Sequence, residues 1–287
     1  MTKKIIALLL ILTFTITSVA FGDAVVGERV VSLGADLTNA QKEEMKEYFG
    51  VDEDVRVIEV TNEEERKYFL EHIDESIIGT RALSSVYVEK LEEGAGIEVE
   101  SNNITWVTDE MYKNALVTVG IKDAKVMVNS PMKVTGTAAL TGIIKAFEDL
   151  TGEKLSEEEK EIASEELAKT SELGKDENIG KEKATELINE IKIYIINNNI
   201  TNINEIKEVV EDKANELDIN LTQEQIDDIS KLMDKISGLD LDLNEIKNQI
   251  KGLGDKIDKA LDENPEARSF IDKIIDAIRD FFNSIFN

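Results

Sequence analysis

The sequence predicts an N-terminal α+β or α/β sandwich followed by an all-α helical bundle. Two observations support this fold class. Strand-like runs alternate with helical segments from residue 23 to about residue 152, whereas from about residue 153 to residue 287 the strand pattern disappears and apolar residues recur every three or four positions. Interleaved strands and helices are typical of a sheet covered by helices, and three-four spacing is typical of helices that pack on each other. We therefore expect domains at 23–152 and 153–287.

The strands expected in the first part are β-branched runs bounded by turn residues. They cover residues 25–33, 55–60, 82–91, 97–99 and 124–128, and the turn at 92–96 joins the third strand to the fourth. Helices are expected at 38–49, 61–73, 108–119 and 137–150. Two of them begin with a capping box, Thr38 with Gln41 and Thr61 with Glu64, in which side chains and backbone N–H groups exchange hydrogen bonds.

The second part contains five or six amphipathic stretches, which predict a helical bundle or an elongated array of helical hairpins. Ser156 with Glu159 and Thr222 with Gln225 form two more capping boxes. Apolar stripes follow at Ala184, Leu187, Ile188, Ile191, Tyr194 and Ile195; at Ile203, Ile206, Val210 and Leu217; and at Ile226, Ile229, Met233 and Ile236. Residues 243–260 then step strictly by three and four, as in a coiled-coil seam.

The first 22 residues read as a secretory signal peptide. Lys3 and Lys4 form a positive start, residues 5–16 are apolar, and small residues precede two cleavage positions, before Phe21 or before Asp23. The apolar run is shorter than the roughly 20 residues that span a bilayer, which favours cleavage over a membrane anchor. The absence of cysteine excludes lipoprotein processing. We therefore expect a protein that is secreted, either extracellular or associated with the cell wall, with no stable membrane span after cleavage.

The net charge limits the kinds of partner that the protein can bind, and the cysteine content indicates the kind of organism that makes it. The formal net charge is −27, and removal of Lys3 and Lys4 with the leader makes it −29. Such a surface repels phosphate backbones, so we expect no nucleic-acid partner. The chain has no cysteine, so about 265 mature residues must build a core without disulfides. Eukaryotic secreted domains usually carry disulfides, and the richness in Ile, Lys, Glu and Asn is associated with Gram-positive bacteria.

No catalytic, metal or cofactor constellation rises above background, so we predict none of these sites. His72 is the one histidine, and no nucleophile elbow accompanies it, which favours a structural role and argues against zinc. Trp106, the one tryptophan, is expected to be a partly buried anchor rather than a sugar platform. With 60 acidic residues, a search for paired carboxylates has no discriminating power.

Two local patterns resemble ion-binding sites, but neither is sufficient to predict one. Asp240, Asp242 and Asn244 have the opening spacing of a calcium loop, but Glu245 and Lys251 occupy the places of its glycine and of its bidentate glutamate. The small residues of 134–142 could offer free N–H groups to an anion at the start of a helix. Close packing of this helix against the sheet explains the small residues more simply and is the preferred interpretation.

The strongest candidate for an interaction is the last amphipathic stretch. Its polar face is nearly balanced in sign, unlike the basic face of an interfacial membrane helix. Packing within its own bundle is one interpretation, and binding of a protein partner or self-association is the other. The residues concerned are Phe270, Ile274, Ile278, Phe281, Phe282, Ile285 and Phe286.

Four motifs in order carry a family resemblance. They are Val31-Ser32-Leu33-Gly34-Ala35-Asp36-Leu37-Thr38; Gly94-Ala95-Gly96-Ile97-Glu98-Val99 with Asn103-Ile104-Thr105 and Val107-Thr108; Tyr112-Lys113-Asn114-Ala115-Leu116 with Gly120-Ile121; and Val134-Thr135-Gly136-Thr137-Ala138-Ala139-Leu140-Thr141-Gly142 with Lys145-Ala146. Together they resemble the uncharacterised secreted family of Gram-positive bacteria catalogued as domain of unknown function 1002. The resemblance implies export and assigns no activity, cofactor or catalytic residue.

Two hypotheses of function remain open at this stage. The first is a non-enzymatic binding or scaffold protein of the bacterial cell envelope. The second is a secreted hydrolase that acts on cell-wall polymer or peptide, with Ser84 or Ser85 as candidate nucleophiles.

Overall fold

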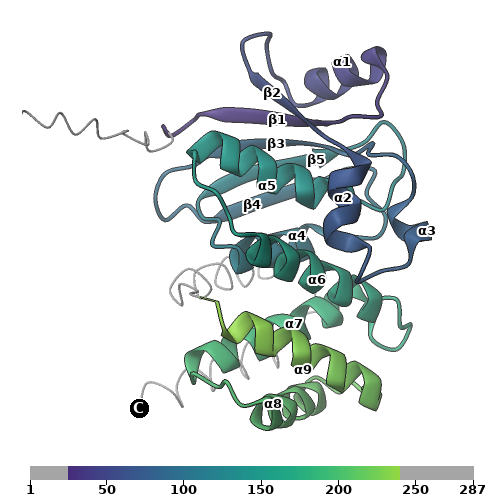
Figure 1. Cartoon of the computed structure of the whole chain (residues 1–287), viewed down its shortest axis with the longest axis vertical. Coiled ribbons are helices and arrows are strands. Elements are labelled where there is room, and N and C mark those ends of the chain that lie inside the picture. Colours follow the sequence, from purple (N-terminus) through teal and green to yellow (C-terminus); the bar gives the residue numbers. More distant parts are fainter. Residues whose placement is uncertain (1–24, 240–287) are drawn as a thin grey trace, which may run out of the picture.

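A computed structural model describes residues 25–239 of the chain (Figure 1). The leader, the seam at 243–260 and the apolar stripe at 270–286 lie outside the described residues. In chain order the elements are β1 (Arg29–Gly34), α1 (Asn39–Tyr48), β2 (Arg56–Val60), α2 (Asn62–Phe69), α3 (Glu75–Ile78), β3 (Ser85–Lys90), β4 (Ile97–Ser101), α4 (Asp109–Thr118), β5 (Ala124–Asn129), α5 (Thr137–Thr151), α6 (Glu157–Leu173), α7 (Gly180–Asn197), α8 (Ile203–Glu216) and α9 (Gln223–Ser237).

The strands form one mixed sheet in the order β2-β1-β3-β5-β4. β1 pairs with β2 in parallel, and β4 pairs with β5 in parallel, while the central β3 is antiparallel to both β1 and β5. The sheet is therefore four parallel strands with one reversed strand in the middle. The N-terminal part has a mixed sheet and the later part is helical, which confirms the α+β character of the chain.

The turn at 92–96 joins the third strand, β3, to the fourth, β4, as expected. Both strands flanking the turn at 92–96 are present, as β3 and β4, but they do not pair as a hairpin because β5 lies between them. The turn carries the chain past the place that β5 later fills. In the completed sheet, Val126 of β5 is opposite Val88 on one side and Val99 on the other.

The two faces of the sheet are covered by different helices. Alternate residues of β1 point to opposite sides, so that Val30 joins one core cluster and Val31 another. The larger cluster lies under α5 and α4, and α5 crosses the sheet over β1 and β3. The smaller cluster lies under α1, where Met45 and Phe49 pack against Tyr87. This alternation places helices on both faces of the sheet.

Helix α6 joins the sheet-containing part to the helices that follow (Figure 1). Its Leu167 belongs to the core cluster that lies on the sheet, and its Ile162 belongs to a second cluster shared with α7, α8 and α9. The stripes expected on these helices are largely buried; Ile203, at the first turn of α8, is exposed. The domain boundary near residue 153 and the bundle remain predictions, because residues 240–287 are not described.

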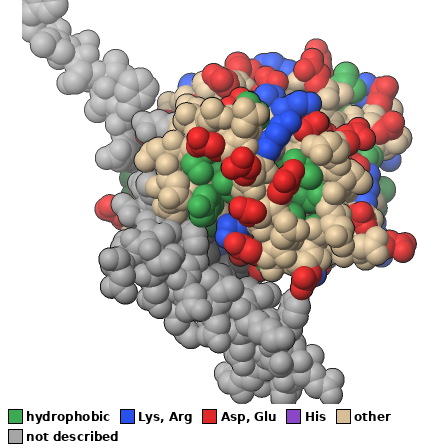
Figure 2. All heavy atoms as spheres, turned by 90° about the horizontal axis from the view of Figure 1, so that it is seen from below, with side chains coloured by type: hydrophobic (Ala, Val, Ile, Leu, Met, Phe, Trp, Pro, Cys, Tyr) green, Lys and Arg blue, Asp and Glu red, His purple; other side chains and the backbone are tan. Residues whose placement is uncertain are grey.

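Each of the four expected capping boxes is present. Thr38, Thr61, Ser156 and Thr222 are N-caps whose hydroxyls accept from the backbone three residues later. In the part of the chain that is described, no helix is long and apolar enough to cross a membrane. Acidic side chains are spread over the end of the molecule formed by α8 and α9, with small apolar areas between them (Figure 2).

Candidate functional site

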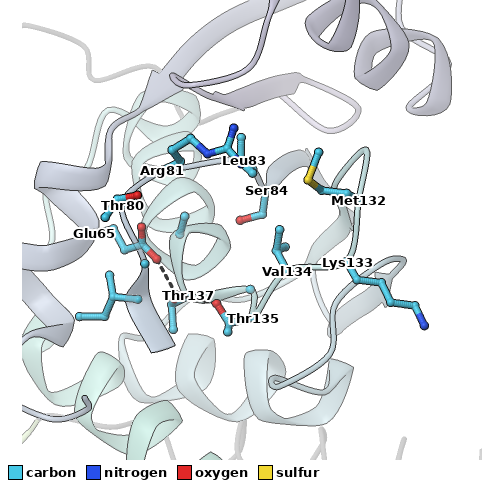
Figure 3. A pocket seen from close by; sticks show the side chains of 14 residues that line it. Glu65, Thr80, Arg81, Leu83, Ser84, Met132, Lys133, Val134, Thr135 and Thr137 are labelled. Carbon is cyan, nitrogen blue, oxygen red and sulfur yellow. Dashed lines mark hydrogen bonds between the residues drawn. The ribbon is translucent and has the colours of Figure 1, made fainter. Parts of the chain in front are cut away.

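A cavity of about 290 Å³ opens at one end of the sheet, where β1 and β5 end and β3 begins (Figure 3). Its volume is near the lower limit of about 300 Å³ for small-molecule sites. The walls come from α2, from the segment that leads into β3, and from the connection between β5 and α5. The lining residues are Glu65, Ile78, Gly79, Thr80, Arg81, Leu83, Ser84, Met132, Lys133, Val134, Thr135, Gly136, Thr137 and Ala138.

The topology of the sheet explains why a cavity forms at this end. After β1 the chain continues to α1 on one face, and after β5 it continues to α5 on the opposite face. Connections that leave the carboxyl ends of parallel strands toward opposite faces open a crevice between them, where α/β proteins commonly bind ligands. Here the reversed strand β3 lies between β1 and β5, so its first residues form part of the floor.

Glu65 of α2 is the most unusual residue of the cavity, because its side chain is a buried carboxyl group that is 1% exposed. Thr137 Oγ1 donates a hydrogen bond to Glu65 Oε1 at 2.5 Å, and Asn62 Nδ2 donates to Glu65 Oε2 at 2.9 Å. The backbone N–H of Ala138 donates as well. Burial raises the pKa of Glu65 to about 7, and these hydrogen bonds oppose the rise only in part.

The Glu65 carboxyl occupies the beginning of α5, where the sequence suggested an anion site. The N-cap there is Gly136, with φ 101°, and no side chain of its own caps the helix. Glu65 supplies the missing acceptor from another helix. An anionic group at a helix N-terminus is stabilised by the unpaired N–H groups and the helix dipole. The beginning of α5 is therefore already capped by a carboxyl group of the protein itself.

Close packing explains the small residues at 134–142, as preferred from the sequence. A Cβ atom on Gly136 would lie 2.4 Å from the Tyr112 hydroxyl and 2.5 Å from Ile104 Cγ2. A Cβ on Gly142 would lie 3.2 Å from Ser32 Oγ. The Tyr112 hydroxyl also donates to the Gly136 carbonyl at 2.5 Å, which fixes the entry of the chain into α5.

Two polar groups of the cavity wall have no partner among the described residues. Ser84 is 2% exposed, and its hydroxyl, which faces the cavity in Figure 3, makes no hydrogen bond within the described chain. Arg81 lies along the rim, exposed, and forms no ion pair there. Lys133 also lines the cavity, but its ammonium group points away. Ser85 is different, since its hydroxyl accepts from the Gly34 N–H at 3.2 Å.

The other residues considered from the sequence lie outside the cavity. His72 follows α2 and is half-buried; burial lowers its pKa, while the charge of Glu165 acts in the opposite direction. Trp106 is 7% exposed, as expected for an anchor, and Lys175 Nζ lies 5.5 Å from its ring centroid.

Within residues 25–239, no group of three or more His, Cys, Asp or Glu side chains is placed to hold a metal ion. The calcium-like residues Asp240, Asp242 and Asn244 and the apolar residues of 270–286 are not described. The partner-binding prediction for that last stretch is therefore untested by the structure.

Sequence reasoning missed Glu65 and Arg81. A signal for Glu65 was present, because it precedes the buried Phe69 by four positions and so shares the inward face of α2. An acid on the apolar face of an amphipathic helix indicates a buried carboxyl group. No comparable signal marks Arg81, since its position at the cavity depends on how the segment before β3 folds.

The fold and the cavity define an α+β protein with a small-molecule-sized crevice at the carboxyl end of its parallel strands. Residues 33–253 match the family described as "Protein of unknown function (DUF1002)", and the chain belongs to that family, as the four motifs indicated. It is 41% identical over 278 residues to "Uncharacterized protein YpuA" of Bacillus subtilis (strain 168), which covers 96% of this chain and 93% of the relative. No solved structure matches the chain significantly.

Proposed function

We propose that the chain is an exported binding protein of the bacterial cell envelope, with its ligand site in the cavity beside Glu65. The observation that carries the proposal is the unpartnered hydroxyl of Ser84, a residue that is 2% exposed and opens onto a cavity of about 290 Å³. A ligand that fills the cavity would take this hydroxyl out of water, so a ligand with a polar group that completes its hydrogen bond would be favoured.

Binding is favoured over catalysis because the carboxyl group at the site is already engaged. Glu65 accepts from Thr137, from Asn62 and from the backbone of Ala138, so its oxygens serve to hold α5. The lining residues include no histidine and, besides Glu65, no carboxylate. Ser84 therefore lacks an adjacent base of the kind that activates a nucleophilic hydroxyl.

A thermal-shift screen of the mature full-length chain against small molecules extracted from bacterial envelopes tests the binding function. A ligand of the cavity should raise the melting temperature of the native protein, and the rise should grow with the logarithm of the ligand concentration once this exceeds the dissociation constant. Ser84→Ala should weaken this response, whereas Ser237→Ala, in the last turn of α9 far along the chain, should not. An equal response of all three proteins would place the ligand elsewhere and contradict the proposal.

The proposal that the protein is exported rests on the sequence of residues 1–22. N-terminal sequencing of the protein recovered from culture medium and from wall fractions should give a chain that begins at Phe21 or Asp23. Recovery of the protein only from the cytoplasm, with Met1 retained, would contradict the localisation.

A hydrolase is the second candidate, and one observation favours it. Glu65, with a pKa raised to about 7 by burial, shares the cavity with the free Ser84 hydroxyl. A carboxyl group that titrates near neutral pH suits general acid–base chemistry. Turnover of peptidoglycan or peptide substrates that is lost in both Glu65→Gln and Ser84→Ala would establish it, and turnover equal to a buffer blank would exclude it.

We further propose that the C-terminal stretch binds a protein partner or a second copy of the chain through Phe270, Ile274, Ile278, Phe281, Phe282, Ile285 and Phe286. The proposal is supported by the width of this apolar stripe in the sequence. Sedimentation equilibrium of the mature chain should show self-association that Phe281→Ser with Phe282→Ser abolishes. A partner other than the chain itself would be recovered from envelope extracts by the unchanged protein and not by this variant.

A further inference from the structure

We propose that the cavity binds a small oxyanion, a carboxylate or phosphoryl group carried by an organic molecule, between Arg81 and Ser84 at the N-terminal end of α5. This inference rests on the proposed binding function and names the class of ligand. It also predicts that binding is accompanied by the uptake of a proton at Glu65.

The cation that would recognise the oxyanion is Arg81. Of the four arginines in the described part of the chain, Arg56 and Arg66 form ion pairs with acids, whereas Arg29 and Arg81 form none. Arg81 lies on the cavity rim and pairs with no described acid. A guanidinium group offers a planar pair of donors that matches the two oxygens of a carboxylate or phosphoryl group.

The floor of the cavity supplies the second donor. Ser84 is 2% exposed, and its hydroxyl faces the cavity and has no partner among the described residues. It lies directly before β3, whose first residue, Ser85, is fixed by its bond to Gly34. Ser84 is therefore held on a rigid element, and its hydroxyl can donate to an oxygen that Arg81 also contacts.

The backbone at the start of α5 adds to the attraction for a negative group. Gly136 provides no capping side chain, and of the helix's first N–H groups that of Ala138 is bound to Glu65 while that of Ala139 is bound to the Gly136 carbonyl. These two N–H groups are therefore not free for a ligand, and the helix contributes through its dipole, whose positive end lies in the cavity wall at Gly136, Thr137 and Ala138. Thr135, whose hydroxyl lies 3.3 Å from that of Thr137, continues the polar wall.

Glu65 determines when this site accepts an anion. As a carboxylate it would repel a second negative group in the same cavity, whereas as a neutral acid it would not. Burial raises its pKa to about 7, so the neutral form is already well populated at neutral pH. An oxyanion that enters should raise this pKa further, and binding should therefore take up a proton.

Several titratable and charged groups surround Glu65 on the elements packed against it. Tyr112 of α4 is buried and its pKa is raised well above 10, so its hydroxyl stays neutral. Residues of α5 and α6 form ion pairs with residues of α2, namely Lys145 with Glu64 and Glu157 with Lys67. The surrounding charges are Arg66 beside Glu65 on α2, Asp109 on α4, Arg81 and Lys133 on the cavity wall, and the pairs Glu64–Lys145, Lys67–Glu157 and Lys160–Glu148.

Two-dimensional NMR titration of the mature full-length chain with acetate and with inorganic phosphate tests the inference, with chloride at matched ionic strength as reference. We expect saturable shifts of the backbone amides at 80–84 and 136–138. Comparison of the acetate titration with the phosphate titration distinguishes a carboxylate ligand from a phosphoryl ligand. Because Glu65 is about nine-tenths neutral at pH 6 and about one-tenth neutral at pH 8, acetate, which is ionised at both pH values, should bind about tenfold more weakly at pH 8.

Three variants separate the roles. Arg81→Gln should weaken binding at least about tenfold, the loss of one charge-assisted contact. Arg29→Gln, which removes an exposed arginine at the opposite end of β1, should leave it unchanged. Glu65→Gln should remove the pH dependence of acetate binding; a pH dependence that persists would assign the proton to another group and overturn the coupling.

Absence of saturable shifts with both probes, or equal losses in Arg81→Gln and Arg29→Gln, would overturn the oxyanion site. If the envelope screen nevertheless yields an uncharged ligand that depends on Ser84, the proposed binding function stands and only the ligand class is wrong. If both probes bind and the protein is found only in the cytoplasm, the proposed location fails and the oxyanion site stands.

Discussion

The hydroxyl of Thr137, the first residue of α5, donates to the Oε1 atom of Glu65 on α2 at 2.5 Å, across 72 positions of the sequence. The same carboxyl group accepts from the backbone N–H of Ala138 and so replaces the capping side chain that Gly136 lacks. It also joins two helices that lie on the same face of the sheet, so the acid both fixes the start of α5 and forms one wall of the cavity.

The first prediction concerns the pH dependence of stability. The pKa of Glu65 is raised from 4.5 to about 7 by burial, so the folded state holds a proton that the unfolded state has released between these pH values. The free energy of unfolding should therefore be highest below about pH 4.5, fall as the pH rises to 7, and be constant above it with respect to this group. The full change is about 3 kcal/mol at most.

Urea unfolding of Glu65→Gln at pH 5 and pH 7.5 checks this, because the neutral amide cannot titrate and the variant should lose less stability over the interval than the parent. Glu186→Gln is the matched control, since burial also raises the pKa of Glu186 to about 7. Glu186 is more exposed, so its removal should flatten the profile less. A parent profile that is flat over the interval contradicts the buried-acid assignment.

The second prediction concerns a buried ion pair beneath the sheet. Lys192 of α7 and Glu166 of α6 are each 1% exposed and are joined at 2.5 Å. Lys192 also donates to the Thr118 hydroxyl at 2.9 Å, and Thr118 donates to the second oxygen of Glu166. Lys192→Met should destabilise the chain by about 3–5 kcal/mol because it leaves the Glu166 carboxylate buried without a counter-charge.

Thermal and urea unfolding followed by circular dichroism measure the effect. Lys207→Met is the control, since its pair with Asp227 is half-exposed at 2.7 Å and should contribute less than about 1 kcal/mol. Lys192→Met combined with Glu166→Met should recover most of the loss. Equal losses in the two single variants would mean that the buried pair is no more important than a surface pair.

The third prediction concerns the capping box at the N-terminus of α9, whose two residues are three positions apart in the sequence. Thr222 accepts from the Gln225 N–H at the start of α9, and the Gln225 side chain accepts from Thr222 N. Thr222→Ala should destabilise the chain by about 1 kcal/mol. Thr222→Ser keeps the hydroxyl and should cost less in the same unfolding experiment; an equal cost for both would show that the cap contributes nothing.

Capping boxes such as this one could be predicted from the sequence because donor and acceptor are three residues apart. The strand order could not. Nothing in residues 85–101 indicates that β5 would enter between β3 and β4, since that pairing depends on a segment more than twenty positions later. Local chemistry therefore predicted the elements, and long-range pairing determined their arrangement.

Glu65, in the candidate site, was missed for the same reason. Glu65 is buried only because α5 docks on α2 and brings Thr137 to its carboxyl group. Its spacing from Phe69 indicated an inward position, but the partner that makes the position favourable is distant in the sequence. Ser84 was named from the sequence only as a generic nucleophile, and its role at a cavity follows from the fold.

The fourth prediction concerns the left-handed turn that starts α5. Gly136 has φ +101°, and a Cβ atom there would lie within 2.5 Å of the Tyr112 hydroxyl and of Ile104. Gly136→Ala should destabilise the chain by about 2–4 kcal/mol, because backbone strain and overpacking add. Gly94 is the matched control, because it has φ +84° and a Cβ atom added there would meet no atom within 4 Å. Gly94→Ala should therefore cost only the backbone strain, about 1–2 kcal/mol.

The two variants also report on the cavity, because displacement of Gly136 moves the N-terminus of α5 away from Glu65. Gly136→Ala should therefore reduce the pH dependence of stability as well as the stability itself, since a Glu65 carboxyl that reaches water has a more ordinary pKa. Gly94→Ala should leave the pH dependence intact. If both variants lose the same stability and keep the same pH profile, the contact of Gly136 with Tyr112 does not position the beginning of α5.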